Sequence, residues 1–373
     1  MIIFCHLLND NSGSPIILRD AISVLDPDGH NSMLFVGSQG RGALEKVCTP
    51  ISRYWYRRSR FRIFTLFTYL ASQVFLYRAL TKAQLPTNTI VYVNTLLPFG
   101  AAIWARRNQC RLLYHIHEVS ISPRLLQYFL IRIIEKTADC VIYVSEDNRF
   151  RMPLRGVHSA VIPNPITPQI AAVGSATPYK PRRSGKFEVL MLASPRNFKG
   201  IPEFLKLARR LAARLDIHFT LVLNGSDSEI GNYLPDSSVP DNVKVHPRTD
   251  HPEHFYAGAD VLLNLSRVDQ WVETFGLTIV EGMAFGLPVI APPVGGPIEI
   301  ITNGQEGYLI DSRNGEKLER TLLNLADSPE CTELISAAAR RRAAHYTIAR
   351  FSDGLRTQIS FLTSNPKAGE IRK

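Results

Sequence analysis

Short apolar runs alternate with helix-length segments along nearly the whole of this chain. In the first half the runs cover residues 2–8, 33–36, 89–93, 111–116, 140–144 and 160–162. In the second half they cover residues 187–193, 218–223, 243–246, 260–265, 288–291 and 307–310. Strands that alternate with helices in this way are typical of a parallel, doubly wound sheet with helices on both faces. The pattern therefore predicts an α/β fold with two such sheets.

The alternation is interrupted once, near the middle of the chain. Residues 167–186 are rich in Pro, Gly, Ser and Ala and end in the basic segment Lys-Pro-Arg-Arg-Ser-Gly-Lys, a composition typical of a linker. We expect an N-terminal domain of residues 1–170, a linker of residues 171–186 and a C-terminal domain of residues 187–350. The cleft between the domains is the expected ligand site, because open α/β sheets bind ligands beyond the carboxyl ends of their strands.

The composition agrees with two soluble globular domains. The chain has 373 residues, of which 45% are hydrophobic and 20% charged, and this is enough apolar material for two sizeable cores. Its five cysteines are scattered and indicate neither a disulfide framework nor a metal knuckle, which favours a reducing compartment. Residues 1–8 lack a basic leader and are expected to form the first strand, not a signal peptide.

The positive charge is unevenly placed. The net charge is +10, and nearly all of the basic surplus lies in residues 1–175. Such a surplus suits nucleic acid, an anionic membrane surface or phosphorylated substrates, and charge alone does not choose among them.

One stretch of the second half predicts a loop that opens directly into a helix. Apolar residues recur at helical spacing from Leu277 onward. Unpaired amides at a helix start suit a phosphate, and the residues that would supply them are Phe275, Gly276, Leu277 and Thr278. Glu273 precedes the helix and Glu281 lies inside it; a carboxylate accepts hydrogen bonds from sugar hydroxyls. Phosphate donors flanked by two such acceptors favour a nucleotide sugar as the ligand.

This stretch also carries a family resemblance. The run from Glu273 to Glu281, followed by Gly-Leu-Pro-Val and Gly-Gly-Pro-x-Glu, resembles the donor signature of the family 4 retaining glycosyltransferases (glycosyl transferases group 1), of the bacterial surface-polysaccharide type. The resemblance extends with weaker motifs over most of the chain. It implies the GT-B architecture, two Rossmann-like domains facing a central cleft, with a final helix at residues 351–363 that packs back on the first domain. An ordinary helix-to-strand crossover is the alternative reading of the stretch itself.

In the N-terminal domain the resemblance implies two contacts with the substrates. Gly13 and Ser14 stand where the family has a small-residue loop that touches the donor phosphates or the acceptor, although one glycine replaces the usual pair; a plain helix cap by Ser12 or Ser14 is the alternative. His117 ends a strand where the family has a histidine that contacts the donor sugar. His115 falls on the same face by alternation, and a satisfied or surface histidine is the alternative for both. Two histidines alone do not make a zinc site.

In the C-terminal domain the resemblance implies a loop that contacts the donor diphosphate and a pocket for the base and ribose. Arg196 and Lys199 follow the first strand of the domain, and an arginine fork with a lysine point charge can stabilise a departing diphosphate. Arg196 is shifted from the usual position, so a solvated arginine is its alternative, and Lys199 is expected at an exposed position without core contacts. The residues that would line the base and ribose pocket are Asn224, Gly225, Arg248 and Thr249.

No metal and no other cofactor is expected. Asp26 and Asp28 spell the Asp-x-Asp pattern of metal-dependent glycosyltransferases, but they lie beside Gly29 at a helix end and indicate a turn. In the family's architecture the basic pair and the helix start take the place of a divalent cation.

Residues 53–77 have two interpretations. Basic residues interleaved with Tyr, Trp and Phe fill residues 53–62 and lead into an apolar helix at residues 63–77, which is expected to be too short and too polar to span a bilayer. An interfacial helix on anionic lipid and a buried core helix with a basic end are both open. Nucleic-acid binding is not expected, because no recognised module accompanies the segment.

The function that follows is a metal-independent, retaining hexosyltransferase. It would move a sugar from a nucleoside diphosphate sugar to a glycan or polyprenyl-linked acceptor in surface polysaccharide biosynthesis, at the inner face of the cytoplasmic membrane. The expected catalytic residues are His117, Arg196, Lys199 and Glu273. A nucleotide-sugar epimerase of the same architecture and a non-catalytic nucleotide-sugar-binding module are the alternatives.

Overall fold

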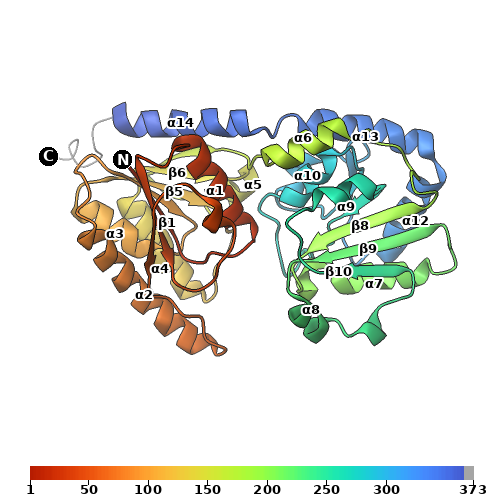
Figure 1. Ribbon diagram of the computed structural model, residues 1–373, viewed down its shortest axis with the longest axis horizontal. Helices are drawn as coiled ribbons and strands as arrows, with labels where there is room; N and C mark the ends of the chain where they lie inside the picture. The colour runs from red at the N-terminus through yellow and green to blue at the C-terminus, as the bar shows by residue number, and fades with distance from the viewer. Residues whose placement is uncertain (365–373) are drawn as a thin grey trace. The chain divides into compact units, whose positions relative to one another are not determined.

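The computed structural model describes residues 1–364 and divides them into two units (Figure 1). Unit 1 holds residues 1–164 together with the last helix, α14 (Ile348–Ser364), and unit 2 holds residues 165–347. Each unit carries one parallel sheet with helices around it, so the predicted pair of Rossmann-like domains is confirmed.

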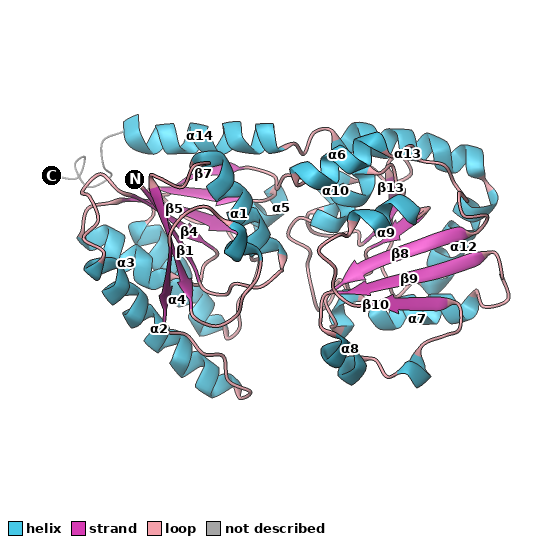
Figure 2. Cartoon of the chain, in the orientation of Figure 1, coloured by secondary structure: helices cyan, strands magenta, loops and turns pink. Residues whose placement is uncertain are grey.

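The sheet of unit 1 has seven strands in the order β3-β2-β1-β4-β5-β6-β7 (Figure 2). All neighbouring strands pair in parallel; Cys5 of β1, for example, lies opposite both Phe35 and Val93. The strands are β1 (Ile2–His6), β2 (Ser32–Gly37), β3 (Ile51–Tyr54), β4 (Ile90–Asn94), β5 (Arg111–Ile116), β6 (Cys140–Tyr143) and β7 (His158–Val161).

Helices cover both faces of this sheet (Figure 1). α1 (Gly13–Leu25) packs against α14, while α2 (Arg62–Lys82) packs against α3 (Phe99–Arg107) and α3 against α4 (Arg124–Thr137). The short helices η1 (Ala43–Lys46) and α5 (Glu146–Arg151) complete the unit. Because both faces are covered, every residue of β4 is buried, as expected for a parallel strand.

The sheet of unit 2 has six strands in the order β10-β9-β8-β11-β12-β13, again all parallel. The strands are β8 (Phe187–Ala193), β9 (Ile217–Leu223), β10 (Val243–His246), β11 (Val261–Leu263), β12 (Val289–Ala291) and β13 (Gly307–Leu309). One set of packed helices contains α7 (Ile201–Arg210) and α12 (Gly315–Asp327). The other contains α6 (Pro168–Ala176), α9 (Glu253–Gly258), α10 (Leu277–Ala284) and α13 (Pro329–Ala343). Shorter helices are η2 (Asn197–Lys199), α8 (Asp227–Tyr233), η3 (Asp236–Ser238) and α11 (Pro297–Ile300).

Both sheets are doubly wound, and this fixes where a ligand site can form. In unit 1 the strand order reverses between β1 and β4, and in unit 2 between β8 and β11. The loops that leave two such strands depart to opposite faces and leave a crevice at their carboxyl ends.

Two details differ from the expectations drawn from the sequence. The units divide between residues 164 and 165 and not in the expected linker of residues 171–186, whose first residues, 171–176, belong to α6. The rest of it is tied into unit 2: Tyr179 donates to Asp260 O at 2.8 Å and Arg182 pairs with Asp216 at 2.9 Å. Strand β3 was not predicted, because its sequence Ile-Ser-Arg-Tyr is not an apolar run.

Candidate active site

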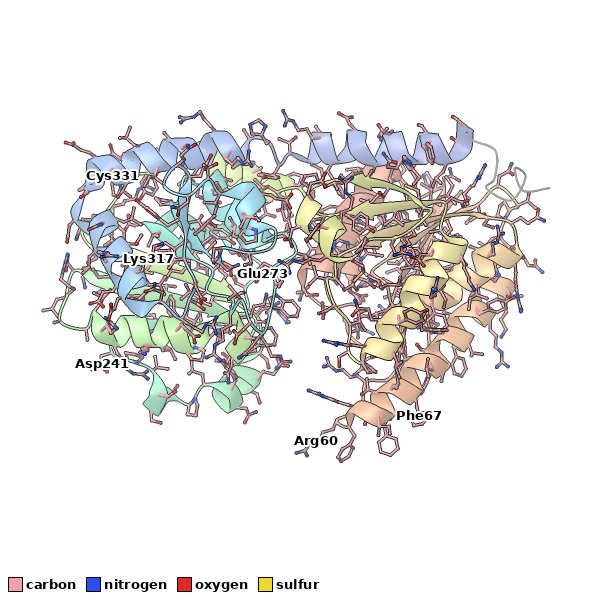
Figure 3. All side chains as sticks on the ribbon, turned by 180° about the vertical axis from the view of Figure 1, so that it is seen from behind. Arg60, Phe67, Asp241, Glu273, Lys317 and Cys331 are labelled. Atoms are coloured by element: carbon pink, nitrogen blue, oxygen red, sulfur yellow. The ribbon has the colours of Figure 1, made fainter. Side chains whose placement is uncertain are left out.

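Lys199 and Glu273 lie at the same edge of the sheet of unit 2, although they are far apart in the sequence. Lys199 ends η2, directly after β8, and Glu273 lies in the loop after β11. These two strands are neighbours where the strand order reverses. The two side chains therefore meet at the position where open α/β sheets bind ligands; Figure 3 labels Glu273 there.

Gly200 allows the two loops to approach each other. Its φ is +84°, in the left-handed region that favours glycine. A Cβ at this position would lie 2.0 Å from Leu265 O, so any other residue would push the loops apart. The contact is completed by a hydrogen bond from Arg267 N to Phe198 O at 2.8 Å.

The Lys199 ammonium forms an ion pair with the Glu273 carboxylate, with Nζ 2.6 Å from Oε1. Ser266 Oγ donates to the same oxygen at 2.6 Å. The Trp271 side chain also donates to this carboxylate, and the Lys199 Nζ lies 4.7 Å from the Trp271 ring centroid. The side chains of Lys199 and Glu273 are only 19% and 14% exposed. The expected exposed Lys199 is therefore wrong, because this ion pair draws it into the site.

The surroundings of Glu273 keep it ionised. Burial raises the pKa of Glu273, but the positive charge of Lys199 and the hydrogen bonds from Lys199, Ser266 and Trp271 outweigh burial and leave the pKa below its ordinary value. At neutral pH the group is therefore a carboxylate, the form that accepts hydrogen bonds from sugar hydroxyls.

The loop that carries Glu273 opens into α10, as predicted. Helix α10 begins at Leu277 directly after Gly276, whose φ is +108°, and its first turn contains no acidic residue. Gly296 packs behind the loop: its N donates to Glu273 O at 2.8 Å, and a Cβ would lie 2.4 Å from Phe275 Cα. The positive end of the helix dipole thus lies beside the ion pair. The role of Phe275, Gly276, Leu277 and Thr278 as phosphate donors stays a prediction.

Glu281 is oriented by a tyrosine that the sequence analysis did not single out. Tyr256 donates to Glu281 Oε2 at 2.7 Å. Tyr256 itself is fully buried, with its ring centroid 5.5 Å from that of Phe285. The buried Tyr256 hydroxyl therefore fixes the direction of the Glu281 carboxylate. Glu281 lies inside α10, the helix that follows the loop of Glu273.

Arg196 does not join the ion pair. Its side chain is exposed and its Nη1 lies 3.4 Å from Pro195 O. Hydrogen bonds from Ser226 lower the pKa of Glu229, and the charges of Arg248 and Arg196 lower it further. The charges of Arg196 and Arg248 thus both reach Glu229, beside the predicted base pocket, and the role of Arg196 at the diphosphate stays a prediction.

The predicted base-pocket residues do lie together. Asn224 and Gly225 follow β9, and Arg248 and Thr249 follow the neighbouring strand β10. Arg248 N donates to Gly225 O at 3.1 Å, and Asn224 N donates to Ala193 O at the end of β8 at 2.8 Å. These loops form one continuous edge beside the Lys199 loop.

In unit 1, His117 and Ser14 are joined through a residue that the sequence analysis missed. Asn94 ends β4; its Nδ2 donates to Ser14 O at 3.0 Å, and its Oδ1 lies 2.9 Å from His117 Nε2. Because Oδ1 is an acceptor, His117 carries its proton on Nε2. This leaves Nδ1 as an acceptor for a hydroxyl. Gly13 begins α1, and the side chain of its N-cap residue, Ser12, makes no capping bond.

His115, inside β5, and His117, just after it, are both neutral at neutral pH. Burial lowers the pKa of His115 to about 3. Burial also lowers the pKa of His117 well below its ordinary value, and repulsion from His115 and His6, in their protonated forms, lowers it further. Their ring centroids are 4.3 Å apart, which confirms that they share a face. His115 is fully buried, and its Nδ1 lies 2.7 Å from the Tyr92 hydroxyl. It is therefore a core histidine, but only half satisfied, because its buried Nε2 has no hydrogen-bond partner among the described residues.

Glu118 braces the turn that follows Asn94. Thr95 has a φ of +74°, which is strained for a β-branched residue. Glu118 accepts hydrogen bonds from Leu96 N at 3.4 Å and from His117 N at 3.2 Å, and it also bonds the Thr95 side chain. Burial raises the pKa of Glu118 to about 7 against these opposing hydrogen bonds. Strained turns held from several sides are frequent at functional sites.

The structure also bears on the metal expectation. Asp26 Oδ2 accepts hydrogen bonds from Asn31 N at 3.0 Å and from Ser32 Oγ at 2.6 Å, so its interpretation as a turn residue is confirmed. Within residues 1–364, one group of side chains could hold a metal ion, because the ligand atoms of His251, Glu253 and His254 lie within 4.8 Å of one another. This group lies at the start of α9 and was not singled out from the sequence.

Two family models match the chain. Residues 12–170 match "Glycosyltransferase Family 4", and residues 178–342 match "Glycosyl transferases group 1". Together they span most of unit 1 and most of unit 2.

The similar curated proteins match in part of their length. A D-inositol 3-phosphate glycosyltransferase of Arthrobacter sp. (strain FB24) is 30% identical over 39% of this chain and 36% of its own length. A sucrose synthase of Acidithiobacillus caldus is 38% identical over 23% of this chain and 11% of its own length. The matched segments are thus well under half of each relative.

The solved structures match over almost the whole chain. Anabaena HepE in complex with UDP-glucose has a TM-score of 0.76 and 20% identity over 96% of this chain and 99% of its own. A sucrose-phosphate synthase of Thermosynechococcus elongatus has a TM-score of 0.75 and 17% identity over 97% of this chain and 99% of its own. With both family models matched and the two Rossmann-like domains in place, the chain belongs to the family 4, group 1 glycosyltransferases of the GT-B fold.

Proposed function

We propose that this chain is a retaining glycosyltransferase that moves a sugar from a nucleoside diphosphate sugar to a glycan or lipid-linked acceptor. The observation that carries the proposal is the Lys199–Glu273 ion pair, which lies at the strand reversal of unit 2 beside the start of α10. A cation, a helix start and a sugar-hydroxyl acceptor in one place suit a sugar joined to a diphosphate. Anabaena HepE, a structural neighbour, is described in complex with UDP-glucose.

Each charged side chain takes one part of the donor. Lys199 and the amides of residues 275–278 would bind the diphosphate, while Glu273 would accept from hydroxyls of the transferred sugar. Glu281, oriented by Tyr256, would accept from the ribose. Arg196 and Arg248 lie further along the edge, near the loop that holds Asn224 and Gly225, and would meet the outer phosphate or the base. His117 offers its Nδ1 to a sugar hydroxyl.

The transfer would proceed on one face of the sugar. The bond between the anomeric carbon and the leaving phosphate oxygen breaks, and the acceptor hydroxyl oxygen bonds to the same carbon from the same side. The departing diphosphate takes the hydroxyl proton. The protein then needs no covalent nucleophile; its part is to hold the reactants and to stabilise charge on the leaving oxygen with the Lys199 ammonium and the helix start. We propose that no metal ion is needed for this step.

We assign the enzyme to surface polysaccharide assembly, as a peripheral protein on the inner face of the cytoplasmic membrane. The arginine-rich segment before α2 supports this assignment. The similar curated proteins are named for a phosphorylated inositol and for sucrose, so a small soluble acceptor is the competing possibility that the experiment below must address.

The test has two stages. Thermal unfolding with a panel of nucleoside diphosphate sugars identifies the donor, since a ligand at about 100 times its dissociation constant stabilises by roughly 2.7 kcal/mol. The donor is then incubated with lipid-linked, glycan and polyol phosphate acceptors, and the products are identified by mass spectrometry and by the anomeric proton coupling. A retained anomeric configuration in a glycosylated product is expected. Interconversion of the free donor would instead establish an epimerase, and binding without either reaction would establish a binding module.

A further inference from the structure

Helix α2 is apolar on both of its sides, unlike an ordinary surface helix, which is polar on its outer side. Its side turned into unit 1 includes the polar Ser72 and Gln73, which are 0% and 2% exposed, while Phe64 and Phe67 on the outer side are 58% and 62% exposed. Gln73 is satisfied inside, where its Oε1 accepts from Gly100 N at 3.0 Å. The outer side chains recur at helical spacing and form a single stripe: Ile63, Phe64, Phe67, Leu70, Val74 and Phe75. Figure 3 shows Phe67 projecting away from the unit.

The segment of chain that contains this stripe has basic but no acidic residues. No Asp or Glu occurs between Glu45 and Glu118, whereas that interval contains many arginines. Four of them are exposed beside the start of α2, namely Arg57, Arg58, Arg60 and Arg62. Arg78 and Lys82 are exposed near the other end of the helix. The stripe from residue 63 to residue 75 is about 18 Å long at about 1.5 Å per residue, so basic groups flank it at both ends.

A second helix adds to the same surface. Helix α4 packs on α3, which in turn packs on α2. In the first turns of α4, Leu125, Tyr128 and Phe129 are 83%, 60% and 43% exposed, and Arg124 is exposed beside them. We define the α2–α4 surface as the α2 stripe, these α4 side chains and the arginines named above.

Length and composition alone would also allow α2 to cross a membrane, as the one such helix among residues 1–364. The helix is longer than the expected residues 63–77, so length and composition do not by themselves exclude a span; that it does not span a bilayer stays a prediction. Its packing gives a different reason for remaining at the surface. Tyr69, Leu76 and Leu80 are at most 4% exposed in the core of unit 1, and a spanning helix would have to expose them along with Ser72 and Gln73.

We propose that the α2–α4 surface docks unit 1 on an anionic lipid bilayer, with α2 lying along the interface. Aromatic and aliphatic side chains would enter the headgroup boundary, and the arginines would bind lipid phosphates. The charge decides between possible occupants: two copies of this surface would bring like charges together, whereas anionic lipid is complementary to it. Membrane docking itself does not depend on the proposed function; only its role in presenting a lipid-linked acceptor rests on that function.

Docking would place the acceptor site beside the lipid. Helix starts lie at the carboxyl edge of a doubly wound sheet, so the starts of α2 and α4 lie at the edge that carries Asn94 and His117. A polyprenyl-linked acceptor could then reach this edge of unit 1 with its lipid still in the bilayer.

The experiment is co-sedimentation of the full chain with vesicles of phosphatidylcholine alone and of phosphatidylcholine mixed equally with phosphatidylglycerol. We expect binding to the anionic vesicles that weakens with salt. Replacement of Arg57, Arg58, Arg60 and Arg62 by Ser should lower partitioning by about a thousandfold at low ionic strength, because each of the four charges contributes a factor of about 5 to 6. The triple variant Phe64→Ser, Phe67→Ser, Phe75→Ser should lower it at least about tenfold at any salt concentration.

Matched controls change equally exposed residues of unit 2. Leu215→Ser with Leu334→Ser, at positions 82% and 74% exposed, should leave binding unchanged. So should replacement of the exposed Lys206, Lys317, Arg320 and Arg341 by Ser. Equal binding to neutral vesicles, unchanged binding by the α2 variants, or a concentration-dependent dimer that the triple variant abolishes would each overturn the proposal.

A measurement on the unaltered helix covers the case in which a variant misfolds. Trp55 is 42% exposed and its ring centroid lies 5.4 Å from that of Phe75. Brominated lipid should quench its fluorescence, and Trp55→Phe should remove the quenching; no quenching would overturn the proposal. Transfer to a soluble acceptor is measured in parallel. If the α2 variants leave the vesicles but still transfer sugar to the soluble acceptor, the change concerns membrane docking alone. If the unaltered protein binds vesicles but transfers no sugar to any acceptor, the proposed function is contradicted and the docking proposal stands.

Discussion

Glu118 is the residue whose charge state most clearly links the fold to pH. Burial raises its pKa to about 7 from an ordinary value of 4.5, so between these values the folded chain keeps a proton that the unfolded chain has lost. Stability must therefore fall as pH rises through this window and level off above it. Allowing for partial exposure to solvent, the change is on the order of 2 kcal/mol.

Glu118→Gln should remove this dependence, because the amide is neutral at every pH. Leu96 N donates to Oε1 and His117 N to Oε2, so the single amide oxygen keeps one of these two bonds, and loss of the other lowers stability equally at every pH. The measurement is urea unfolding of both proteins from pH 4.5 to pH 7.5. The free energy of unfolding of the variant, relative to the unaltered protein, should rise across the window. Glu330→Gln at an exposed position of α13 is the control, and parallel curves for Glu118→Gln and the unaltered protein would contradict the assignment.

At the scale of elements, the loop between Glu273 and α10 depends on the close approach of the Gly296 backbone to Phe275 and Thr274. The backbone of Gly296 is ordinary, with a φ of −53°, so strain does not require glycine there; space does. An alanine Cβ would lie 2.4 Å from Phe275 Cα and 2.7 Å from Thr274 O. The loop between Glu273 and α10 would have to move.

Gly296→Ala should therefore lower the affinity for the nucleotide-sugar donor at least about tenfold. It should also lower the free energy of unfolding by about 1 to 3 kcal/mol, as overpacking does. Calorimetric titration with the donor, together with thermal unfolding, checks both effects. Gly258→Ala is the matched control in unit 2, because nothing lies within 4 Å of its added Cβ. Unaltered donor affinity in Gly296→Ala would mean that the loop is not part of the donor site.

The same scale separates what the sequence could predict from what it could not. Apolar runs located most strands, and chain order then placed Lys199 and Glu273 after strands that the topology makes neighbours. Strand β3 was missed because its residues are mixed in polarity, and α6 because its Pro, Gly, Ser and Ala content is also that of a linker. Periodicity gave the existence of α2 but not which of its sides faces water.

The sequence also did not identify single polar residues that contact the candidate site. Asn94, Ser266 and Trp271 contact predicted site residues, but each is one side chain without a spacing pattern. The position of Asn94 at the end of an apolar strand was a usable signal. Arg196 was expected at the diphosphate with Lys199, and the sequence could not show that its side chain is exposed and lies against Pro195 O.

For the molecule as a whole, the proposed chemistry makes a prediction about metal ions. Lys199 and the start of α10 already supply positive charge, so turnover should be unchanged in excess chelator and should not rise with magnesium or manganese. Loss of activity that metal restores would contradict this. The double variant His251→Ala, His254→Ala would then test the one candidate ligand group within residues 1–364.

The central claim, that the Lys199–Glu273 pair is where the sugar leaves its diphosphate, is tested most directly by the turnover of Lys199→Ala. Removing one preorganised donor from a leaving oxygen costs roughly 100-fold to 1000-fold in kcat, about 2.7 to 4 kcal/mol. Loss of the ion pair should also lower stability by about 1 to 3 kcal/mol, so folding is checked by thermal unfolding.

Lys199→Arg should recover only part of the rate, because a planar fork does not occupy the place of a compact ammonium. Lys206→Ala, at an exposed position of α7, should turn over normally. We predict a folded Lys199→Ala protein with kcat lowered by at least about 100-fold; a folded Lys199→Ala protein with near-normal kcat would contradict the account.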